Sequence, residues 1–590
     1  KTHLMMRLAQ DVLSTNRLLF IRQPNHPDSV LFHTYSRILE SFVEPVPNTD
    51  YTQLDYLLAQ GFINFLHSQS SRLSKKGKEF LDQLQESHLS LFDFLNRGSN
   101  QTKQQNWQRM ERWLTDWWKD TYSGAGYAIP IIKGIVKYCR YTDPHYKQLI
   151  TRWLAGGELE DKEADQIGLE KWSDELDKEG FALEAISIFG KFSLLDEPLI
   201  IVFDQLEGLG LSHNEQTLVK FGQAIKEIFT HVPNSLIILN VFPDRWEQFQ
   251  NKWDDAATTE RIAQHEIRLD QHQPDQENFK AILQLKISEL DISFDELFTE
   301  EEQDDILSQP SIRAAINRAS GYYKHKVYGT PLPATSESLN QPQTNTDYRL
   351  QKLEEEVAGI KRQLQQELAG DKSAREEPVP DEEPKPELNG SSNTRETPPS
   401  NSVQEEILNY LKEQEQELNQ QYQKPTIIND HDDIGKIVEI AQSFQYLTSL
   451  EMQTLKLGKK KIPDHLVLKK GKKGNVLGFL QIAGSAFTAR LKNFNQLVVS
   501  NPNFNFTLMR DAREPKITGK VGRQEIEKLN HTDNGNFTIL QQADRVELEL
   551  LYKLITDINN QEFDVKLETA LETFLEQRPH HWLTQFLLVN

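Results

Sequence analysis

Four polar residues at the start or end of predicted elements are of the types that handle a nucleotide. Lys1 and Thr2 open an amphipathic helix, Asp204 follows the apolar strand Leu199–Phe203, and Asn240 ends another apolar strand. At such positions a lysine reaches the β and γ phosphates, while a threonine hydroxyl and an aspartate carboxylate bind Mg²⁺. An amide at the end of a neighbouring strand would orient the attacking water. The pattern indicates a site for ATP and Mg²⁺.

Each of these signals also fits a structural role. Buried strands often end in a capping aspartate or another polar residue, and the Lys-Thr pair is a weak signal without the glycines that precede it in a Walker A motif. We expect the chain to begin inside such a motif. Downstream, Arg261 and Arg313 stand where arginines could neutralise charge on a γ phosphate, although most arginines are solvated surface residues.

A run of lysines forms a second group suited to chemistry. Eight lysines, with no glutamate and only Asp464 among acids, occur between residues 456 and 473, and Arg490 and Lys492 follow on the next predicted helix. Lysines that neutralise phosphates release counterions, so this surface favours contact with DNA or RNA. A solvated face or an acidic protein partner is the alternative. The lysines are Lys456, Lys459, Lys460, Lys461, Lys469, Lys470, Lys472 and Lys473.

Short strands alternating with helices must position the nucleotide residues. Apolar strands are predicted at Arg17–Arg22, Leu199–Phe203 and Ser235–Val241, and helical periodicity borders each of them. This order is typical of an α/β fold. A long helix between the first two strands carries aromatic residues on one face, which we expect to pack in the core rather than stack on nucleic-acid bases. These residues are Trp107, Trp113, Trp117 and Trp118.

Low-complexity segments divide the chain. Residues 330–347 turn into Pro, Ser, Thr, Asn and Gln, and residues 369–402 carry six prolines among acidic and small polar residues, so neither can bury enough apolar surface to fold alone. Between them, apolar residues at steps of three and four predict a short coiled coil or a helix packed on its own domain. We predict an ATPase core at 1–268, a helical lid at 269–329, a linker at 330–347, the coiled coil at 348–368, a disordered linker at 369–402 and a C-terminal α/β domain at 403–590.

The C-terminal domain has its own order of elements. It begins with a helix and three strands, followed by a helix, a strand, a helix, a strand and further helices. The predicted bounds are Ile434–Phe444 for the first helix, Ser449–Leu457, His465–Leu468 and Val476–Ile482 for the three strands, Ala486–Val499 for the second helix, and Phe504–Met509 and Asn536–Leu540 for the last two strands.

Composition limits the classes of function. The chain has 590 residues, and 66 Lys and Arg against 88 Asp and Glu give a formal net charge of −22, which excludes attraction of the whole surface to nucleic acid or anionic lipid. The single cysteine, Cys139, cannot form an intramolecular disulfide or a Cys-based zinc site, and this favours a reducing compartment. The longest apolar runs are far shorter than a membrane span. We expect a cytoplasmic protein that does not enter a membrane.

The nucleotide residues together resemble a known family. Residues 1–330 are similar to AAA+/STAND-type P-loop ATPases of prokaryotic conflict systems, such as the initiator-like ATPases of BREX phage-defence operons. The resemblance rests on Lys1-Thr2-His3-Leu4, on Asp204-Gln205-Leu206-Glu207, which is similar to the Asp-Gln-Phe-Glu variant of Walker B, and on the strand that ends at Asn240. It implies a homo-oligomer in which Arg261 is a finger reaching a neighbouring subunit. Arg313, on the helix of a small lid, would be the second sensor.

One position departs from the pattern of that family. AAA+ enzymes place a catalytic Glu directly after the Mg²⁺-binding Asp, and here that position is Gln205. A neutral amide can orient water but cannot accept its proton. Glu207 could act as the base if the turn brings it round. Otherwise hydrolysis should be slow, and the nucleotide would act mainly as a conformational switch.

The C-terminal domain resembles a second family. Over roughly residues 433–542, the strand order with Pro463-Asp464-His465 and Phe479-Leu480-Gln481-Ile482-Ala483 is similar to the PD-(D/E)xK nuclease core. That resemblance implies a restriction-endonuclease-like fold, with Asp464 and Gln481 in the site. Ala483 replaces the expected Lys, so we expect a degenerate domain that does not cleave. An unrelated α/β domain is the alternative.

Three hypotheses of function remain open. The first is a DNA-associated, slowly hydrolysing ATPase of an antiphage defence system, working with proteins such as a nuclease or a methyltransferase. The second is a STAND-like signalling scaffold that senses a protein partner. The third is an ATP-dependent regulator of transposition or replication. DNA-stimulated hydrolysis would favour the first or third, and ligand-triggered assembly without DNA would favour the second.

Overall fold

The chain forms an α/β protein that is mostly helical, with a small parallel sheet and a separate mixed sheet. The computed structural model describes residues 18–46, 48–122, 126–173, 176–194, 198–253, 266–267, 276–287, 292–309, 312–329, 400–424, 426–446, 451–471, 473–560 and 562–587. Two compact units are present, one made of residues 1–266 and 397–590 and the other of residues 267–396. The N-terminal and C-terminal parts of the first unit are called the N-terminal half and the C-terminal half below.

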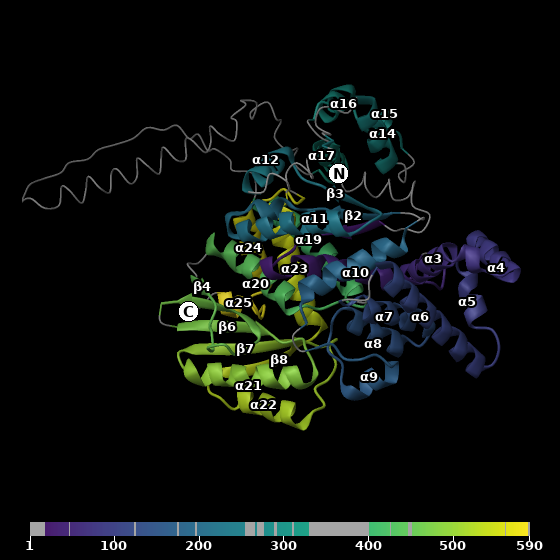
Figure 1. Ribbon diagram of the computed structural model, residues 1–590. Coiled ribbons are helices and arrows are strands. Elements are labelled where there is room, and N and C mark those ends of the chain that lie inside the picture. Colours follow the sequence, from purple (N-terminus) through teal and green to yellow (C-terminus); the bar gives the residue numbers. More distant parts are fainter. Residues whose placement is uncertain are drawn as a thin grey trace, which may run out of the picture. The chain divides into compact units, whose positions relative to one another are not determined.

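The N-terminal half is built on three parallel strands in the order β1-β2-β3 (Figure 1). They are β1 (Leu18–Ile21), β2 (Leu199–Phe203) and β3 (Ser235–Leu239), so the three predicted strands are confirmed. The residues of β2 are all buried, as expected for a central strand of a parallel sheet, which is covered on both faces.

A long helical insertion separates β1 from β2. It supplies α2, which contacts β1, and α10, which packs on α2 and on the later helix α11 (Glu215–His231). Its elements are η1 (Pro27–Ser29), α2 (Val30–Val43), α3 (Gln53–Ser68), η2 (Ser70–Arg72), α4 (Lys75–Glu86), α5 (Ser90–Leu95), α6 (Asn100–Tyr122), α7 (Ala128–Arg140), α8 (Pro144–Leu154), α9 (Asp161–Ile167) and α10 (Lys178–Phe192). After β2 follow η3 (Glu207–Gly210), η4 (Ser212–Asn214) and α11, and after β3 follows α12 (Pro243–Lys252).

The tryptophan-rich face of α6 lies mainly in the core. Trp107, Trp117 and Trp118 are buried, which confirms the core assignment for these three residues. Trp113 differs, because 46% of its surface is exposed and Arg109 lies 5.9 Å from its ring centroid.

The C-terminal half has a five-stranded mixed sheet in the order β4-β5-β6-β7-β8. The first two pairings are antiparallel and the last two are parallel. Its elements are α19 (Ser400–Gln421), α20 (Asp430–Ser443), η8 (Phe444–Tyr446), β4 (Glu451–Gln453), β5 (Asp464–Lys470), β6 (Lys473–Phe479), α21 (Gly484–Ser500), β7 (Phe504–Asp511), α22 (Lys520–Asn530), β8 (Gly535–Leu540), α23 (Gln542–Asn559), α24 (Leu567–Gln577) and α25 (Thr584–Leu587). The predicted order of helices and strands is confirmed, and α19 precedes it.

Helices cover both faces of this sheet (Figure 1). Alternate strand residues point to opposite faces. On β5, Leu466 and Leu468 join the core beneath α19, α20, α23 and α24, whereas Val467 joins the core beneath α21 and α22. The result is a three-layer αβα arrangement.

The two halves of the first unit are joined by polar contacts from the segments that follow β1 and β2. His33 Nδ1 lies 3.1 Å from Asp432 Oδ1, and the Tyr552 hydroxyl donates to Asn25 Oδ1 at 2.6 Å. A Cβ on Gly435 of α20 would lie 2.4 Å from the carbonyl oxygen of Asn25, so the helix approaches this backbone closely. The expected ATPase core at 1–268, up to Glu266, and the expected domain at 403–590 belong to one compact unit.

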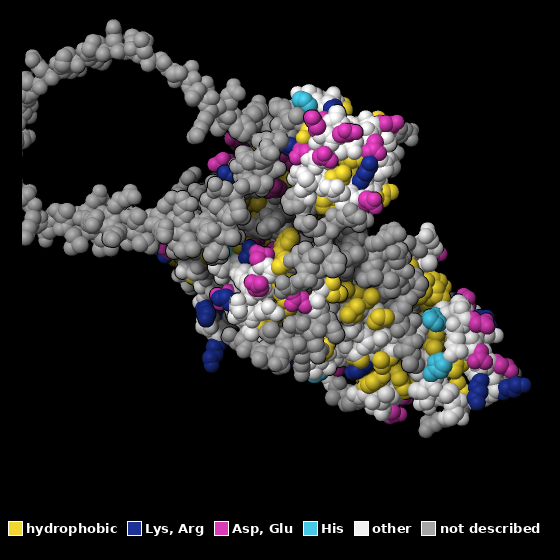
Figure 2. Space-filling view, turned by 90° about the horizontal axis from the view of Figure 1, so that it is seen from above, with side chains coloured by type: hydrophobic (Ala, Val, Ile, Leu, Met, Phe, Trp, Pro, Cys, Tyr) yellow, Lys and Arg dark blue, Asp and Glu magenta, His cyan; other side chains and the backbone are white. Residues whose placement is uncertain are grey.

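The second unit is helical where it is described. It contains α14 (Gln276–Ile287), α15 (Phe294–Leu297), α16 (Glu300–Leu307) and α17 (Ile312–Tyr328), which share a small core. Exposed acidic side chains of α15 and α16 gather on the face seen in Figure 2. They are Asp295, Glu296, Glu300, Glu301 and Asp304.

Several predicted features lie outside the described residues. These are Lys1, Thr2, Arg261, Lys472, the side chains of Arg313 and Lys470, the coiled coil, and both linkers apart from the start of α19. Arg313 belongs to α17, so its predicted position on a helix is confirmed. Within the described ranges, no helix combines the length and the apolar character that crossing a bilayer requires.

Candidate functional site

Asp204 and Asn240 meet at the carboxyl ends of two adjacent parallel strands. The register pairs Phe203 of β2 with Leu239 of β3, so the next residue of each strand lies at the same edge of the sheet. Asn240 Nδ2 donates to Asp204 Oδ1 at 3.2 Å, and its backbone N–H donates to the Phe203 carbonyl oxygen at 2.9 Å. Both side chains are buried, with 8% of each residue exposed. The structure therefore brings two of the predicted nucleotide residues into contact.

The local sequence explains this position. β2 is a run of five apolar residues, and Asp204 is the first polar residue after it. The Asp204 backbone N–H donates to the Ile21 carbonyl oxygen at 3.0 Å, which extends the ladder to β1 by one residue. The chain then turns at Gln205, which has a φ of 58°. A non-glycine residue in this left-handed region is uncommon and is often held there by its surroundings.

The Gln205 side chain is bonded to the C-terminal half. Its Nε2 donates to Glu562 Oε2 at 2.7 Å, in the segment that follows α23. This bond engages the amide nitrogen that would otherwise be available to a water molecule at the candidate site.

Glu207 is the first residue of η3 and is 6% exposed. Its turn is held from two sides. Asn214 Nδ2 donates to the Gly208 carbonyl oxygen at 3.0 Å. A Cβ on Gly208 would lie 2.6 Å from Gln23 Oε1, so the residue after Glu207 packs closely on the segment that follows β1. Glu207 thus lies in a constrained turn three residues after Asp204.

The donor set at this edge fits Mg²⁺ bound together with a nucleotide. Among the described residues, no group of three or more His, Cys, Asp or Glu side chains is arranged to hold a metal ion alone. Mg²⁺ at nucleotide sites commonly uses one or two carboxylates and completes its shell with phosphate oxygens and water. If Mg²⁺ binds here, Asp204 would supply one such carboxylate, with the Asn240 amide beside it.

Comparison with protein-family models, curated proteins and solved structures finds no match for this chain. Function must be argued from the geometry of the chain itself.

The two residues predicted for a nuclease-like site have different partners. Asp464 begins β5, and its Oδ2 lies 3.3 Å from His431 Nδ1. Gln481 is buried after β6, where its Nε2 donates to Asp433 Oδ2 at 3.2 Å and its Oε1 accepts the Asp511 backbone N–H at 2.9 Å. The side-chain amide of Gln481 is thus engaged in the interior. Ala483 is the N-cap residue of α21 and is buried.

A buried charged network surrounds Gln481, and the sequence reasoning missed it. Arg545 NH2 lies 2.7 Å from Asp433 Oδ1 and 2.8 Å from Glu549 Oε1. Burial would raise the pKa of Glu549, but Lys436 and Arg545 lower that pKa to about 2. The available signal was the three acids just before the predicted helix Ile434–Phe444, because buried carboxylates require cationic or N–H partners. These acids are Asp430, Asp432 and Asp433, and they lie in the first turn of α20.

Asp430 is the member of this group of acids whose pKa is raised. Burial raises its pKa to about 6, and the nearby Asp464 adds to the shift, whereas Lys178 and the Gln481 backbone N–H act in the opposite direction. The Gln481 N–H donates to Asp430 Oδ1 at 2.8 Å. Burial also lowers the pKa of Lys178, which belongs to α10 of the N-terminal half.

The described lysines of the predicted basic patch fall into two groups. Lys456, Lys459, Lys460 and Lys461 are exposed in the connection between β4 and β5, and Lys460 Nζ donates to Gln496 of α21 at 2.6 Å. The other group flanks the turn between β5 and β6. In that group Lys473 is exposed, and Lys469 Nζ lies 3.4 Å from Glu451 Oε2. On α21, Lys492 is exposed and Arg490 is half-buried.

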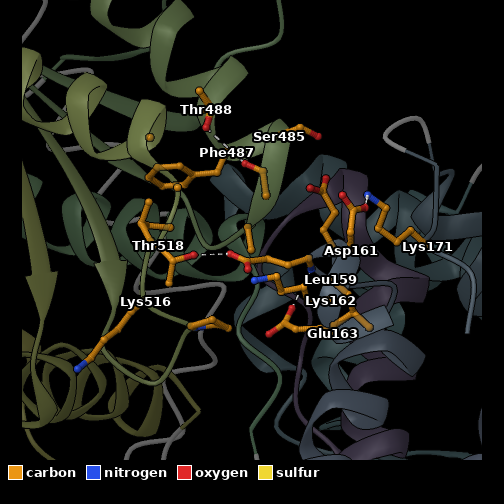
Figure 3. A pocket seen from close by; sticks show the side chains of 18 of the residues that line it. Leu159, Asp161, Lys162, Glu163, Lys171, Ser485, Phe487, Thr488, Lys516 and Thr518 are labelled. Atoms are coloured by element: carbon orange, nitrogen blue, oxygen red, sulfur yellow. Dashed lines mark hydrogen bonds and ion pairs between the residues drawn. The ribbon is translucent and has the colours of Figure 1, made fainter. Parts of the chain in front are cut away.

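A cavity of about 440 Å³ lies elsewhere, between residues 158–172 of the N-terminal half and the first turns of α21 and α22 with the residues just before them (Figure 3). The Thr518 hydroxyl donates to Glu160 Oε1 at 2.9 Å across it. Its lining includes Glu158, Asp161 and Glu163 but neither Asp204 nor Asn240, so it is separate from the candidate nucleotide site.

Proposed function

We propose that this chain is an ATP-binding, slowly hydrolysing ATPase that associates with DNA, as in a prokaryotic antiphage defence system. The observation that carries the proposal is the hydrogen bond from Asn240 to Asp204 at the carboxyl ends of adjacent parallel strands. In open α/β sheets this edge is where ligands bind. An aspartate after an apolar strand and an amide after its neighbour supply the oxygen ligand and the water-orienting group that Mg²⁺-dependent phosphoryl transfer requires.

Slow turnover follows from the residues after Asp204. Gln205 cannot accept a proton, and its amide is bonded to Glu562. Glu207 is then the candidate for the residue that takes a proton from the attacking water. It lies in a turn that the C-terminal half helps to hold, so we propose that hydrolysis depends on the conformation of both halves.

Contact with DNA is proposed for the exposed lysines before β5. The four lysines from Lys456 to Lys461 stand together on a chain of net charge −22, where they could displace counterions from phosphates. We propose that the C-terminal half binds without cleaving, since Ala483 stands at the lysine position and the Gln481 amide binds Asp433.

A signalling scaffold is the second candidate. It is favoured by the direct contacts of the loop after β2 with the C-terminal half, because a nucleotide bound at that loop could gate a response with little turnover. In this case a protein ligand would trigger assembly without DNA.

The proposal is tested by measuring Mg²⁺-dependent binding of ATP to the full-length protein and to two variants. Asp204→Ala should weaken binding at least about tenfold, because the metal loses its protein carboxylate. Asp244→Ala removes an exposed aspartate of α12 in the same half and should leave binding unchanged. Equal affinities of Asp204→Ala and the parent would refute the nucleotide site. DNA-stimulated ATP hydrolysis would favour the ATPase over the scaffold.

A further inference from the structure

Glu439 of α20 receives hydrogen bonds from two separate segments of the first unit. Its Oε2 accepts from His213 Nε2 at 2.7 Å and from Asn214 Nδ2 at 3.1 Å, and its Oε1 accepts from Asn559 Nδ2 at 3.3 Å. Glu439 itself is 5% exposed. A carboxylate buried to this degree needs such donors, and its bonds to them are stronger than bonds between neutral groups.

The bond from Asn214 reaches the turn of Glu207. Asn214 Nδ2 lies within hydrogen-bonding distance of both Glu439 Oε2 and the carbonyl oxygen of Gly208, the residue after Glu207. A path of three side-chain and backbone groups therefore runs from the C-terminal half to Glu207.

The helix that carries Glu439 is itself fixed at its other end. In its first turn, Asp432 bonds to His33 and Asp433 bonds to Gln481 and Arg545. Two turns further on lies Glu439. Because α20 is one continuous helix, a displacement of its first turn relative to the sheet would also move Glu439.

We propose that Glu439 is a positioning residue for the proposed ATPase, and that it holds Glu207 in place for hydrolysis through Asn214 and the Gly208 carbonyl. This inference rests on the proposed function. It adds that the C-terminal half completes the ATPase site, so that an event at α20 or β5 changes turnover without any contact to the nucleotide.

Two measurements on the full-length protein test this role. Amide hydrogen exchange of residues 204–214, without nucleotide, should be faster in Glu439→Ala than in the parent, because His213 and Asn214 lose their acceptor. In ATP hydrolysis the same variant should lower kcat about tenfold and leave KM within about twofold of the parent value, because the loss affects positioning rather than binding. Glu439→Gln keeps one acceptor oxygen and should restore most of both properties.

Glu415→Ala is the matched control. It removes a glutamate of the C-terminal half whose Oε2 lies 2.9 Å from Arg578 NH2, away from the loop. This control should change neither exchange at 204–214 nor kcat. Unchanged exchange and unchanged kcat in Glu439→Ala would overturn the inference, as would a Glu439→Gln variant as defective as Glu439→Ala. A parent protein that neither binds nor hydrolyses ATP would instead refute the proposed function, and exchange would still report on the contact.

Discussion

Gln205 and Glu562, which are 357 residues apart, are joined by a hydrogen bond of 2.7 Å from Gln205 Nε2 to Glu562 Oε2. Gln205 has a left-handed backbone, with a φ of 58°. The residue after the candidate Mg²⁺ ligand is therefore held by the segment after α23. A glutamine meets this requirement because it donates to the carboxylate, whereas a glutamate at the same place would repel it.

Replacing Gln205 by glutamate should lower stability. Gln205→Glu exchanges a hydrogen bond for two facing carboxylates, which we expect to cost about 1–2 kcal/mol at neutral pH. Thermal or urea denaturation measures the change. Adding Glu562→Gln should restore most of the loss, because a donor then faces an acceptor again. If the double variant is no more stable than Gln205→Glu, this bond does not hold the turn.

Asp430 predicts a pH dependence of stability. Its pKa is raised to about 6 in the folded protein, so between about pH 4 and pH 6 the folded state keeps a proton that the unfolded state has lost. Stability from this group is therefore present at low pH and declines as pH rises towards 6. Asp430→Asn should remove this decline, which we expect to be of the order of 1–2 kcal/mol. The free energy of unfolding, measured with urea at pH 4.5 and at pH 7, should differ less between the two pH values in Asp430→Asn than in the parent protein. A difference in Asp430→Asn as large as that in the parent would contradict the raised pKa of Asp430.

Gly435 should not tolerate a side chain. Replacing glycine by alanine in a helix interior normally stabilises the helix by about 1 kcal/mol. Here the added Cβ would meet the Asn25 backbone oxygen at 2.4 Å, so we expect Gly435→Ala to destabilise by about 1–3 kcal/mol. Gly77→Ala on the exposed helix α4 is the control, since its nearest contact is the Leu73 side chain at 3.3 Å. In thermal denaturation, only Gly435→Ala should have a lower melting temperature than the parent protein. If Gly435→Ala and the parent have equal melting temperatures, α20 does not approach the Asn25 backbone this closely.

The two lysine groups should differ in their contribution to DNA binding. Replacing Lys459, Lys460 and Lys461 by glutamine should flatten the slope of log affinity against log salt by about two to three units, at about 0.9 per phosphate contact. Replacing Lys469 and Lys473 should have a smaller effect, because Lys469 already lies beside Glu451. Binding to duplex DNA at several salt concentrations measures both slopes. An unchanged slope after the triple replacement would exclude these three lysines from DNA binding and would favour the signalling scaffold.

The bound DNA should stay intact when Mg²⁺ or Mn²⁺ is added. Ala483 cannot supply the expected lysine, and the Gln481 amide is engaged with Asp433. If the parent protein cleaves DNA in a metal-dependent reaction and Asp464→Ala does not, the prediction of a non-cleaving domain is wrong.

The sequence by itself determined where the strands lie and which polar residues follow their carboxyl ends. The three strands of the N-terminal half and the order of elements around β5 and β6 follow from apolar runs and their periodicity, which are local properties of the chain. That Asp204 and Asn240 lie at one edge also follows, because parallel strands bring their carboxyl ends together.

Only the tertiary structure decided which partners these polar residues have. Gln205 binds Glu562, Gln481 binds Asp433, and Glu439 binds the loop that carries Glu207. These contacts join segments that are far apart in the chain, and a single sequence holds no periodic signal for them. The physical reason is that a buried polar group takes whichever donor or acceptor the fold brings to it. The charged network below Gln481 and the union of the two halves in one compact unit became visible only when the elements were packed together.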